Sequence, residues 1–262
     1  MMKRIELFGL PLDALNMQET LEVIEKSIDS NRQIHHVVVN AAKIVNAQKD
    51  VNLWESITHC DLINADGQAV VWASKILRRP LPARVAGIDL MECLVALAAK
   101  KNYRIFFLGA KEEVVSKVVA KYSDQYCNKL VAGYRNGYFT KEEEKAVAMQ
   151  IAASKAHILF VAITSPKKEL FLNTYKLDIQ TPFIMGVGGS FDVVSGLVKR
   201  APRWMQKAGL EWFYRVLQEP RRMWRRYLTT NTKFILLLFK EKIKQIYFSK
   251  VGDEYQSEKN LK

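Results

Sequence analysis

The sequence predicts an α/β fold in which helices cover both faces of a mostly parallel β-sheet. Two observations indicate this: short β-rich runs alternate with longer amphipathic segments over residues 1–196, and several of the runs are continuously apolar. Such alternation is typical of parallel sheets, and continuous apolar runs are typical of strands buried on both faces. The sequence therefore predicts a doubly wound sheet, and 262 residues suffice for one large domain with an ample core.

Seven runs are candidate strands, and several segments between them carry helix signals. Asn16 with Glu19, and Thr140 with Glu143, have the spacing of a capping box. Apolar residues recur at helical spacing in 87–102 and in 111–126. The candidate strands are residues 4–9, 35–40, 61–65, 103–109, 129–133, 157–163 and 182–188.

The composition changes near residue 197. Of the net charge of +13, a share of +10 lies in residues 197–262, together with three of the five tryptophans. We therefore expect an α/β core over 1–196, a basic, aromatic-rich helical appendage over 197–248 and a flexible tail over 249–262. The longest uncharged apolar run of the appendage covers only residues 234–239, whereas about 20 residues are needed to span a bilayer.

The cysteines, histidines and carboxylates predict neither a metal site nor a disulfide framework. Cys60, Cys93 and Cys127 are widely spaced, the four histidines form no ligand set, and no Asp-x-Asp pair occurs. The N-terminal segment lacks the pattern of a signal peptide. A reduced, cytoplasmic compartment is therefore expected, and the basic balance predicts an anionic partner.

Two polar residues at predicted strand ends are candidates for chemistry, because ligands of open α/β sheets bind beyond the carboxyl ends of the strands. Asn40, taken alone, is best interpreted as a helix N-cap. Asp66, in the stretch NADG, is favoured as a turn or cap residue by its type and by the adjacent Gly67. The alternative is that Asp66 is a general base, which takes a proton from an attacking hydroxyl.

Two glycine-containing strand ends could contact phosphates. Gly109 ends a predicted strand directly before a helix, whose free N–H groups suit an anion, and Lys111 is a nearby cation. The second strand end, residues 186–192, could form a backbone nest for a diphosphate. It is not a dinucleotide fingerprint, since Phe191 stands where G-x-G-x-x-G needs its third glycine. Asp192 could contact a ribose or cap a helix.

Arginines and aromatic residues alternate closely after residue 200. A merely solvated basic face has no need of so many large rings. Arginine with aromatic residues could stack on nucleic-acid bases or settle at the headgroup level of a membrane. The rings in question are Trp204, Trp212, Phe213, Tyr214 and Trp224.

Four stretches together resemble the WecG/TagA/CpsF glycosyltransferases, over about Leu7 to Tyr227. They are NADGQAVVWASKILRRPLPARVAGIDL, GYF, SPKKE and VGGSFDVVSGLVKRAPRWMQKAGLEWFYRVLQEPRRMWRRY. The resemblance implies a Rossmann-like core and a C-terminal appendage that docks on the membrane and helps complete the active site. It also implies inverting, metal-independent transfer of a hexose-type sugar from a UDP-sugar to a polyprenyl-pyrophosphate-linked saccharide. Such products feed teichoic acid, exopolysaccharide or other cell-surface polysaccharides, and no cofactor is implied.

The resemblance and the strand-end analysis together assign roles to individual residues. Asp66 is the expected catalytic base. The nucleotide-sugar side is expected to comprise Asn40, Gly109, Lys111, Tyr138, Pro166, Lys168, Glu169, Gly188, Gly189 and Asp192. The acceptor pyrophosphate or the lipid surface is expected to meet Arg84, Asp89, Arg215, Arg221, Arg222 and Arg225.

Two positions depart from the family pattern and leave the donor sugar open. Val38 stands where the family often has threonine, and Lys168 replaces a glutamine thought to touch the UDP-sugar. A charged or different hexose is compatible with these departures.

The expected partners are a UDP-sugar, a lipid-pyrophosphate-linked acceptor and the anionic inner face of the cell membrane, with no nucleic acid. The exposed apolar surface of the appendage is expected to drive self-association away from the membrane. Two alternatives to the enzyme stay open on the residues alone. One is a nucleotide-binding oxidoreductase, and the other is a basic module that binds nucleic acid or membrane.

Overall fold

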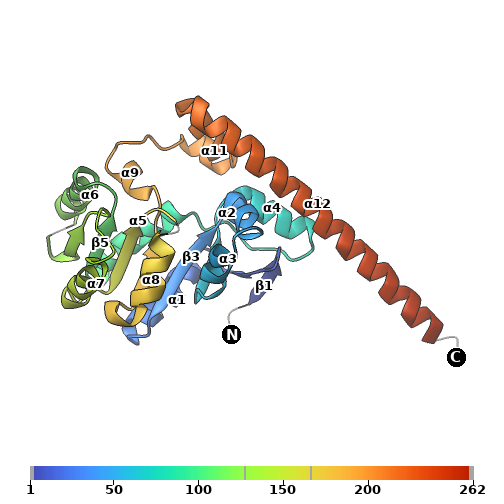
Figure 1. The fold of residues 1–262 in the computed structure, drawn as a ribbon, viewed down its shortest axis with the longest axis horizontal. Helices are drawn as coiled ribbons and strands as arrows, with labels where there is room; N and C mark the ends of the chain where they lie inside the picture. Colours follow the sequence, from blue (N-terminus) through green and yellow to red (C-terminus); the bar gives the residue numbers. More distant parts are fainter. Residues whose placement is uncertain (1–2, 127, 166, 260–262) are drawn as a thin grey trace.

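A six-stranded parallel sheet forms the centre of the computed structural model, which describes residues 3–126, 128–165 and 167–259 (Figure 1). The strand order is β4-β3-β8-β7-β5-β6, and each neighbouring pair is parallel. The predicted α/β, Rossmann-like class is confirmed, and so are the last six predicted strands. These are β3 (Ile34–Val39), β4 (Leu62–Ala65), β5 (Ile105–Gly109), β6 (Val131–Arg135), β7 (Ile158–Ala162) and β8 (Phe183–Gly186).

The first predicted strand belongs to a separate antiparallel hairpin. β1 (Arg4–Leu7) pairs with β2 (Leu10–Asp13), which the sequence pattern did not predict because it is short and contains a proline. The buried Asp13 carboxylate holds the hairpin in place. It accepts a hydrogen bond from the Ile63 N–H of β4 at 2.8 Å and forms an ion pair with Arg4 at 2.8 Å.

Helices cover both faces of the sheet, as a doubly wound fold requires. One face packs against α1 (Met17–Asp29), α5 (Gly87–Lys101), α6 (Glu112–Gln125) and α9 (Ser190–Val194). The other packs against α2 (Ala41–Ala47), α3 (Val51–Thr58), α4 (Gln68–Ile76), α7 (Glu144–Ala153) and α8 (Lys167–Ile179). A single 3-10 turn, η1 (Asn128–Leu130), precedes β6.

The two predicted capping boxes differ in outcome. Asn16 accepts from the Glu19 N–H and Glu19 accepts from the Asn16 N–H, so the box at α1 is confirmed. Near Thr140 only half of the box forms, since Glu143 accepts from the Thr140 N–H while α7 begins at Glu144. A turn over residues 141–143 separates the predicted cap from the helix.

Large aromatic side chains fill the core on one face of the central strands. Phe107 and Phe160 are fully buried, and Phe107 packs against Tyr122 of α6 and Phe191 of α9 with ring centroids 5.8 and 5.9 Å apart. Each such side chain contributes about 1.5–3 kcal/mol through its burial. The packing also explains why position 191 holds phenylalanine rather than glycine, because this residue anchors α9 to the sheet.

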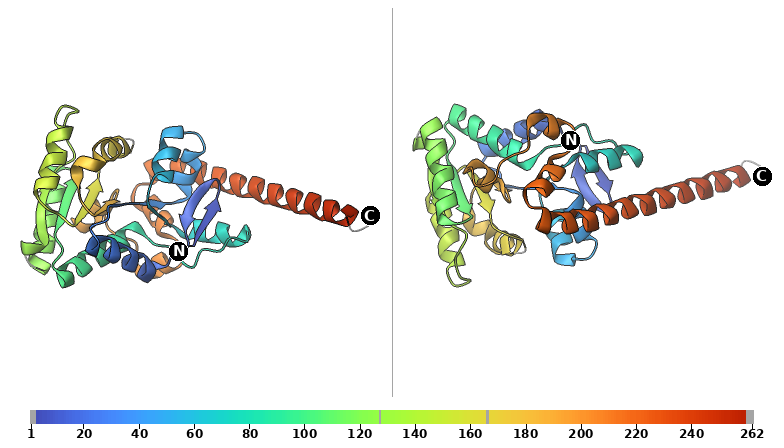
Figure 2. Two further views of the ribbon diagram at one scale, coloured as in Figure 1. Left: turned by 90° about the horizontal axis from the view of Figure 1, so that it is seen from below. Right: turned by 90° about the horizontal axis from the view of Figure 1, so that it is seen from above.

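The C-terminal part forms three helices, α10 (Arg203–Lys207), α11 (Glu211–Gln218) and α12 (Pro220–Lys259). With 40 residues, α12 is roughly 60 Å long at 1.5 Å per residue, and its second half extends beyond the core (Figure 2). Helix α12 continues through residues 249–259, which the sequence analysis separates as a tail. Among the described residues, no helix combines the length and the apolar composition needed to cross a bilayer.

The first half of α12 is packed onto the core. Phe234 is buried and meets the ring of Phe8 edge-on, with centroids 5.4 Å apart. Further along, the Lys242 ammonium donates to the Ile76 carbonyl at 2.9 Å, at the C-terminal end of α4. The cation lies where the helix dipole favours positive charge. Helix α12 is thus held to the hairpin through Phe234 and to the end of α4 through Lys242.

Candidate functional site

The carboxyl ends of the parallel strands lie at one edge of the sheet, and predicted site residues follow them. Asp66 comes directly after β4 and Asn40 directly after β3, which are neighbours. Gly109, at the end of β5, is four strands from β4 in the sheet order. At about 4.8 Å per strand this is a separation of roughly 19 Å. Asp66 and Gly109 can therefore bind opposite ends of one ligand but not the same group.

Asn40 is the N-cap of α2, as its residue type alone indicates. Its side-chain oxygen accepts from the Lys43 N–H at 2.9 Å, and the residue is exposed. The amide nitrogen remains available as a donor, since capping uses only the oxygen. A contact of Asn40 with the nucleotide sugar stays a prediction.

Asp66 does not cap the helix that follows it. Gly67, with φ of 96°, is the N-cap of α4, and no side-chain hydrogen bond caps this helix. The interpretation of Asp66 as the cap of its own helix is therefore wrong. The carboxylate instead accepts a hydrogen bond from the backbone N–H of Gly87, the first residue of α5.

The pKa of Asp66 is raised above its ordinary value. Burial is the largest cause, and the negative charge of Glu211 acts in the same direction. The cations Arg84 and Arg215 and the Gly87 N–H lower the pKa but do not cancel the effect of burial. The residue keeps partial solvent access. A carboxylate whose pKa is raised toward neutrality is a better proton acceptor than a solvated one.

Arg84 and Asp89 lie in one ion-pair network with two residues that the sequence analysis did not single out. Arg84 Nη1 is 2.8 Å from Glu211 Oε2, and Arg200 Nη1 is 2.6 Å from Asp89 Oδ1. Arg200 Nε also lies 3.4 Å from Glu211 Oε1. The network connects the start of α5 with the start of α11. No sequence signal predicts it, because its partners are more than a hundred residues apart in two of the three pairs.

Lys168 and Glu169 form a largely buried ion pair at the start of α8. Lys168 Nζ lies 3.0 Å from Glu169 Oε1, and both side chains are about 12% exposed or less. The aliphatic end of Lys168 covers Gly186, where an added Cβ would lie 3.0 Å from Lys168 Cδ. Burial raises the pKa of Glu169, but Lys168 and Lys43 outweigh it and hold that pKa below its ordinary value.

Lys43, in the first turn of α2, is a cation that the sequence analysis missed. Burial, followed by the charge of Lys168, lowers the pKa of Lys43 to about 8, while Glu169 and Asp66 act in the opposite direction. The charges of Lys168, Glu169 and Asp66 all act on Lys43. The only sequence signal was its position three residues after Asn40, on the helix that starts at the strand end.

Gly109, Lys111 and Tyr138 gather at the ends of β5 and β6. Gly109 allows β5 to approach the end of β7 closely, because a Cβ at this position would lie 2.5 Å from the Ala162 backbone. Lys111 is the N-cap residue of α6, and Glu112 and Glu113 already place two carboxylates in the first turn. These carboxylates weaken the attraction of that N-terminus for a phosphate. Nucleotide binding by the three residues stays a prediction.

The glycine loop after β8 is compact. Gly188 has φ of 53°, Gly189 is the N-cap of α9, and an added Cβ on Gly189 would lie 3.5 Å from Asp192 Oδ2. Burial raises the pKa of Asp192. Asp192 caps no helix, so the alternative of a ribose contact stays a prediction.

The appendage arginines are only partly brought to this edge. Arg215 of α11 acts on Asp66 electrostatically, whereas Arg225 lies over the Trp224 ring, 5.6 Å from its centroid. Arg221 is exposed at the start of α12. Pro166 and the side chain of Arg222 lie outside the described part of the structure.

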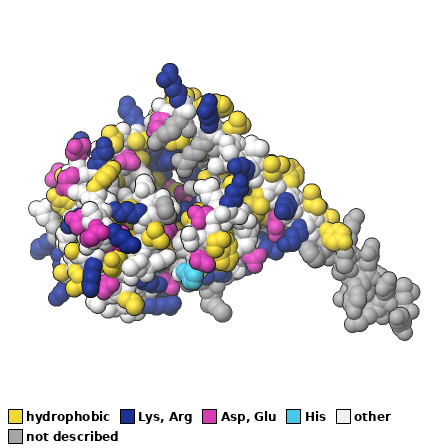
Figure 3. Space-filling model, in the orientation of Figure 1, with side chains coloured by type: hydrophobic (Ala, Val, Ile, Leu, Met, Phe, Trp, Pro, Cys, Tyr) yellow, Lys and Arg dark blue, Asp and Glu magenta, His cyan; other side chains and the backbone are white. Residues whose placement is uncertain are grey.

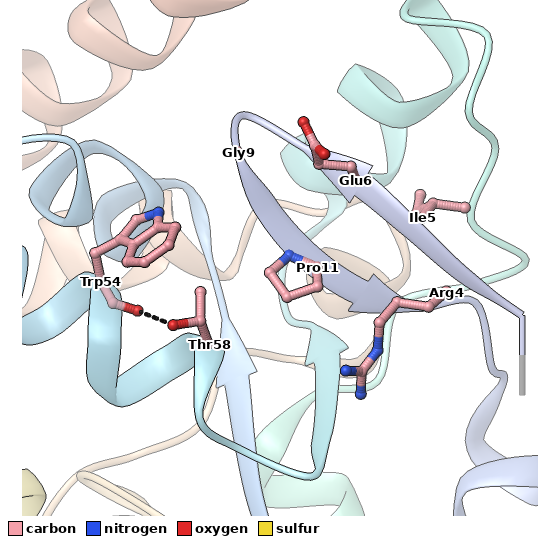
Figure 4. A pocket seen from close by; sticks show the side chains of 7 residues that line it. All are labelled: Arg4, Ile5, Glu6, Gly9, Pro11, Trp54 and Thr58. Carbon is pink, nitrogen blue, oxygen red and sulfur yellow. Dashed lines mark hydrogen bonds between the residues drawn. The ribbon is translucent and has the colours of Figure 1, made fainter.

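Two cavities differ in their position relative to this site. The larger, of about 400 Å³, lies between the hairpin and α3 and is lined by Arg4, Glu6 and Trp54 among others (Figure 4). It contains none of the predicted site residues, and Thr58 in its wall precedes β4, at the opposite edge of the sheet. In the described residues, no group of three or more His, Cys, Asp or Glu side chains is placed to hold a metal ion.

A second, smaller cavity lies at the junction of core and appendage. It has about 30 Å³ and is lined by Lys199, Arg200, Glu211, Tyr214 and Arg215 together with apolar residues. Figure 3 shows that this face of the molecule is hollowed between the core and helices α11 and α12. This small cavity, unlike the one near the hairpin, is lined by a predicted site residue, Arg215.

Comparison with known proteins agrees with this geometry. The profile of the Glycosyl transferase WecG/TagA/CpsF family matches residues 5–247. A relative from Bacillus subtilis (strain 168), named N-acetylglucosaminyldiphosphoundecaprenol N-acetyl-beta-D-mannosaminyltransferase, is 36% identical over 243 residues. The match covers 92% of this chain and 94% of the relative. These matches favour a glycosyltransferase over the two alternatives, a nucleotide-binding oxidoreductase and a basic module that binds nucleic acid or membrane. The chain belongs to the WecG/TagA/CpsF family of glycosyl transferases.

Proposed function

We propose that this glycosyltransferase moves an N-acetylmannosaminyl group, or a closely related hexosaminyl group, from a UDP-sugar to N-acetylglucosamine linked to undecaprenyl diphosphate. The acceptor and the transferred group are those named for the Bacillus subtilis relative. The product is an intermediate of a cell-surface polymer. UDP is proposed as the carrier because the chain shares the motifs of the family.

The observation that carries this proposal is that Asp66 has a raised pKa and a carboxylate that does not cap α4. Its carboxylate lies at the end of β4 without capping α4, and burial raises its pKa despite the opposing charges of Arg84 and Arg215. A general base needs this combination of a free proton-accepting oxygen and a pKa closer to neutrality. Charges of the core, on Arg84, and of the appendage, on Arg215 and Glu211, both act on the pKa of Asp66.

In the proposed step, a hydroxyl oxygen of the acceptor sugar attacks the anomeric carbon of the donor. The new bond is carbon to acceptor oxygen, and the bond from the same carbon to the UDP oxygen breaks, with its electron pair leaving on UDP. The hydroxyl proton passes to Asp66. One base is sufficient because the acceptor attacks the face opposite the leaving group, as water does in inverting glycosidases.

Inversion is consistent with the name of the relative, which gives the transferred group as the β anomer. UDP-N-acetylhexosamines carry the nucleotide in the α configuration. A single displacement on an α-linked donor produces a β-linked product, whereas two displacements would retain the α configuration.

Cationic side chains are proposed to stabilise the departing UDP. Lys43 is in the first turn of α2, directly after β3, and the Lys168 side chain covers Gly186 at the end of β8. Arg215 of α11 acts electrostatically on Asp66 at the end of β4. Charge-assisted hydrogen bonds to a diphosphate are about twice as strong as neutral ones, so such residues can assume the role that a metal ion has in other transferases.

Peripheral membrane binding through the appendage is proposed to bring this site to the lipid-linked acceptor. Large apolar side chains that are 48–66% exposed lie along one face of α12: Ile235, Phe239, Ile243 and Ile246. Their spacing of three and four residues places them on one face, and lysines intersperse them (Figure 3). Such a helix suits the surface of an anionic membrane.

A UDP-release assay tests the proposed function. The full chain is given UDP-N-acetylmannosamine, UDP-N-acetylglucosamine, UDP-glucose or UDP-glucuronic acid, each with and without a short-chain polyprenyl-diphosphate-N-acetylglucosamine. We expect acceptor-dependent release that is fastest with UDP-N-acetylmannosamine, that persists in EDTA and that yields a β-linked product. Release that ignores the acceptor, or no release with any donor, would contradict the proposal.

A further inference from the structure

A carboxylate of the appendage, Glu211, joins two arginines at the boundary with the core. Its two oxygens have different partners, Arg84 at 2.8 Å and Arg200 at 3.4 Å. The three side chains are only 19–27% exposed. At this level of burial an ion pair is screened less than at the open surface, where such pairs contribute about 0–1 kcal/mol.

Arg200 extends the connection into the core. Its Nη1 lies 2.6 Å from Asp89 Oδ1, in the first turn of α5, the helix whose first N–H binds Asp66. Its Nη2 is buried without a hydrogen-bond partner. A guanidinium presents a rigid fork of donors, so one arginine can hold two carboxylates in a fixed relative position.

The same elements are joined to Asp66 through the backbone. The Val85 N–H donates to the Ala65 carbonyl at 2.8 Å, which fixes the segment carrying Arg84 beside the end of β4. On the appendage, Gly209 precedes α11 and lies so close to Gln68 that an added Cβ would be 2.9 Å from Gln68 Cβ. Gln68 is the first residue of α4, two positions after Asp66.

The space around Arg200 does not fit a substrate. The cavity lined by Arg200, Glu211 and Tyr214 has about 30 Å³, which holds a water molecule but neither a sugar nor a phosphate. The side chains of the ionic cluster therefore leave no room for a substrate between them. The cluster can instead fix the relative positions of the side chains that it joins, Arg84, Asp89 and Glu211.

We propose that Glu211 and Arg200 are positioning residues of the glycosyltransferase: Glu211 holds Arg84 at Asp66, and Arg200 fixes Glu211 to Asp89 of the core. The inference rests on the proposed function and specifies how α11 is coupled to the catalytic base. Arg84 is the charged residue with the largest influence on Asp66. Its position thus depends on a carboxylate that the core alone does not possess.

The test measures kcat and donor KM for Glu211→Gln, Arg84→Gln and the double variant, with the full chain and the lipid-linked acceptor. We expect Glu211→Gln to lower kcat about 10- to 100-fold, the size of effect that small displacements at an active site produce, with donor KM within twofold. In the Arg84→Gln background the same substitution should cost less than twofold, because the residue it positions is gone. Arg200→Gln should behave like Glu211→Gln, and Arg200→Lys should recover part of the rate.

Glu25→Gln is the matched control. Glu25 is also 27% exposed and pairs with Lys101 between α1 and α5, so its loss removes an ion pair from a carboxylate of the same exposure, away from Asp66. We expect kcat of this variant within twofold of wild type. Equal and additive losses from Glu211→Gln and Arg84→Gln, or unchanged kcat in Glu211→Gln, would overturn the inference. A wild-type chain without any transfer would instead contradict the proposed function.

Discussion

At the scale of single residues, two strand-end positions with similar sequence signals have different structural roles. Asn40 and Asp66 each follow a buried strand and precede a helix. Asn40 uses its oxygen to cap α2 at 2.9 Å, whereas Asp66 leaves the capping position to Gly67. The left-handed φ of Gly67 is accessible to glycine at no steric cost. The glycine therefore releases the Asp66 carboxylate from its own helix.

Lys43 leads to a prediction about the pH dependence of UDP binding. Burial and Lys168 lower its pKa to about 8, so Lys43 is a cation below pH 8 and becomes neutral above it. UDP affinity, measured by calorimetry, should fall as pH rises through about 8 in the wild type. Lys43→Gln should weaken binding about tenfold at pH 7, the loss of about 1.4 kcal/mol expected for one charge-assisted hydrogen bond, and should abolish the decline above pH 8.

Lys49→Gln serves as the control, since Lys49 is an exposed lysine just beyond the same helix. It should keep both the affinity and the pH profile of the wild type. If Lys43→Gln also keeps both, Lys43 is not part of the donor site.

At the scale of elements, α12 has two different faces. Phe234, Leu237 and Leu238 pack onto the core around α2 and the hairpin. The opposite side carries an apolar stripe that includes Phe239 and Ile243, which are 63% and 66% exposed. The appendage thus shares its hydrophobic core with residues 1–196, and removing it would expose Phe8 and its neighbours. Substitutions on the outer face are therefore a cleaner test of membrane binding than truncation.

The double substitution Phe239→Ser and Ile243→Ser is predicted to weaken binding to vesicles of phosphatidylglycerol and phosphatidylcholine at least tenfold. Burying one such side chain contributes about 1.5–3 kcal/mol, and the lysines of the helix add attraction that salt should screen. Co-sedimentation with vesicles measures the effect. Leu177→Ser, at an apolar site on α8 that is 86% exposed, should bind like wild type. Equal binding by the double variant would exclude this face of α12 as the membrane contact.

The strands and helices of the core could be predicted from the sequence, but the contacts between core and appendage could not. Continuous apolar runs such as IFFLG of β5 identify buried parallel strands because every position meets a helix layer. β2 lacks this signal, since it has four residues and contains Pro11. Arg200 and Glu211 gave no local signal, because an ion pair between distant segments depends on the tertiary fold alone.

At the scale of the whole molecule, the candidate site is assembled from two layers that contribute different chemistry. The sheet edge provides Asp66, with Asn40 and the Lys168–Glu169 pair beside it. The appendage provides Arg215 and Glu211, which act on Asp66 from above the edge. A single sheet edge cannot surround a base with charges on both sides. We propose that the appendage supplies a wall of the site, in addition to the apolar face proposed to meet the membrane.

The direct test of the central claim is the comparison of wild type with Asp66→Asn in two assays on the same preparations, UDP binding by calorimetry and sugar transfer to the lipid-linked acceptor. Asparagine keeps the size of the side chain but cannot accept the proton. We predict UDP affinity within about twofold of wild type and transfer reduced about 10²- to 10⁴-fold, the range for loss of a general base. Near wild-type turnover by Asp66→Asn would contradict the account, since another group would then accept the proton.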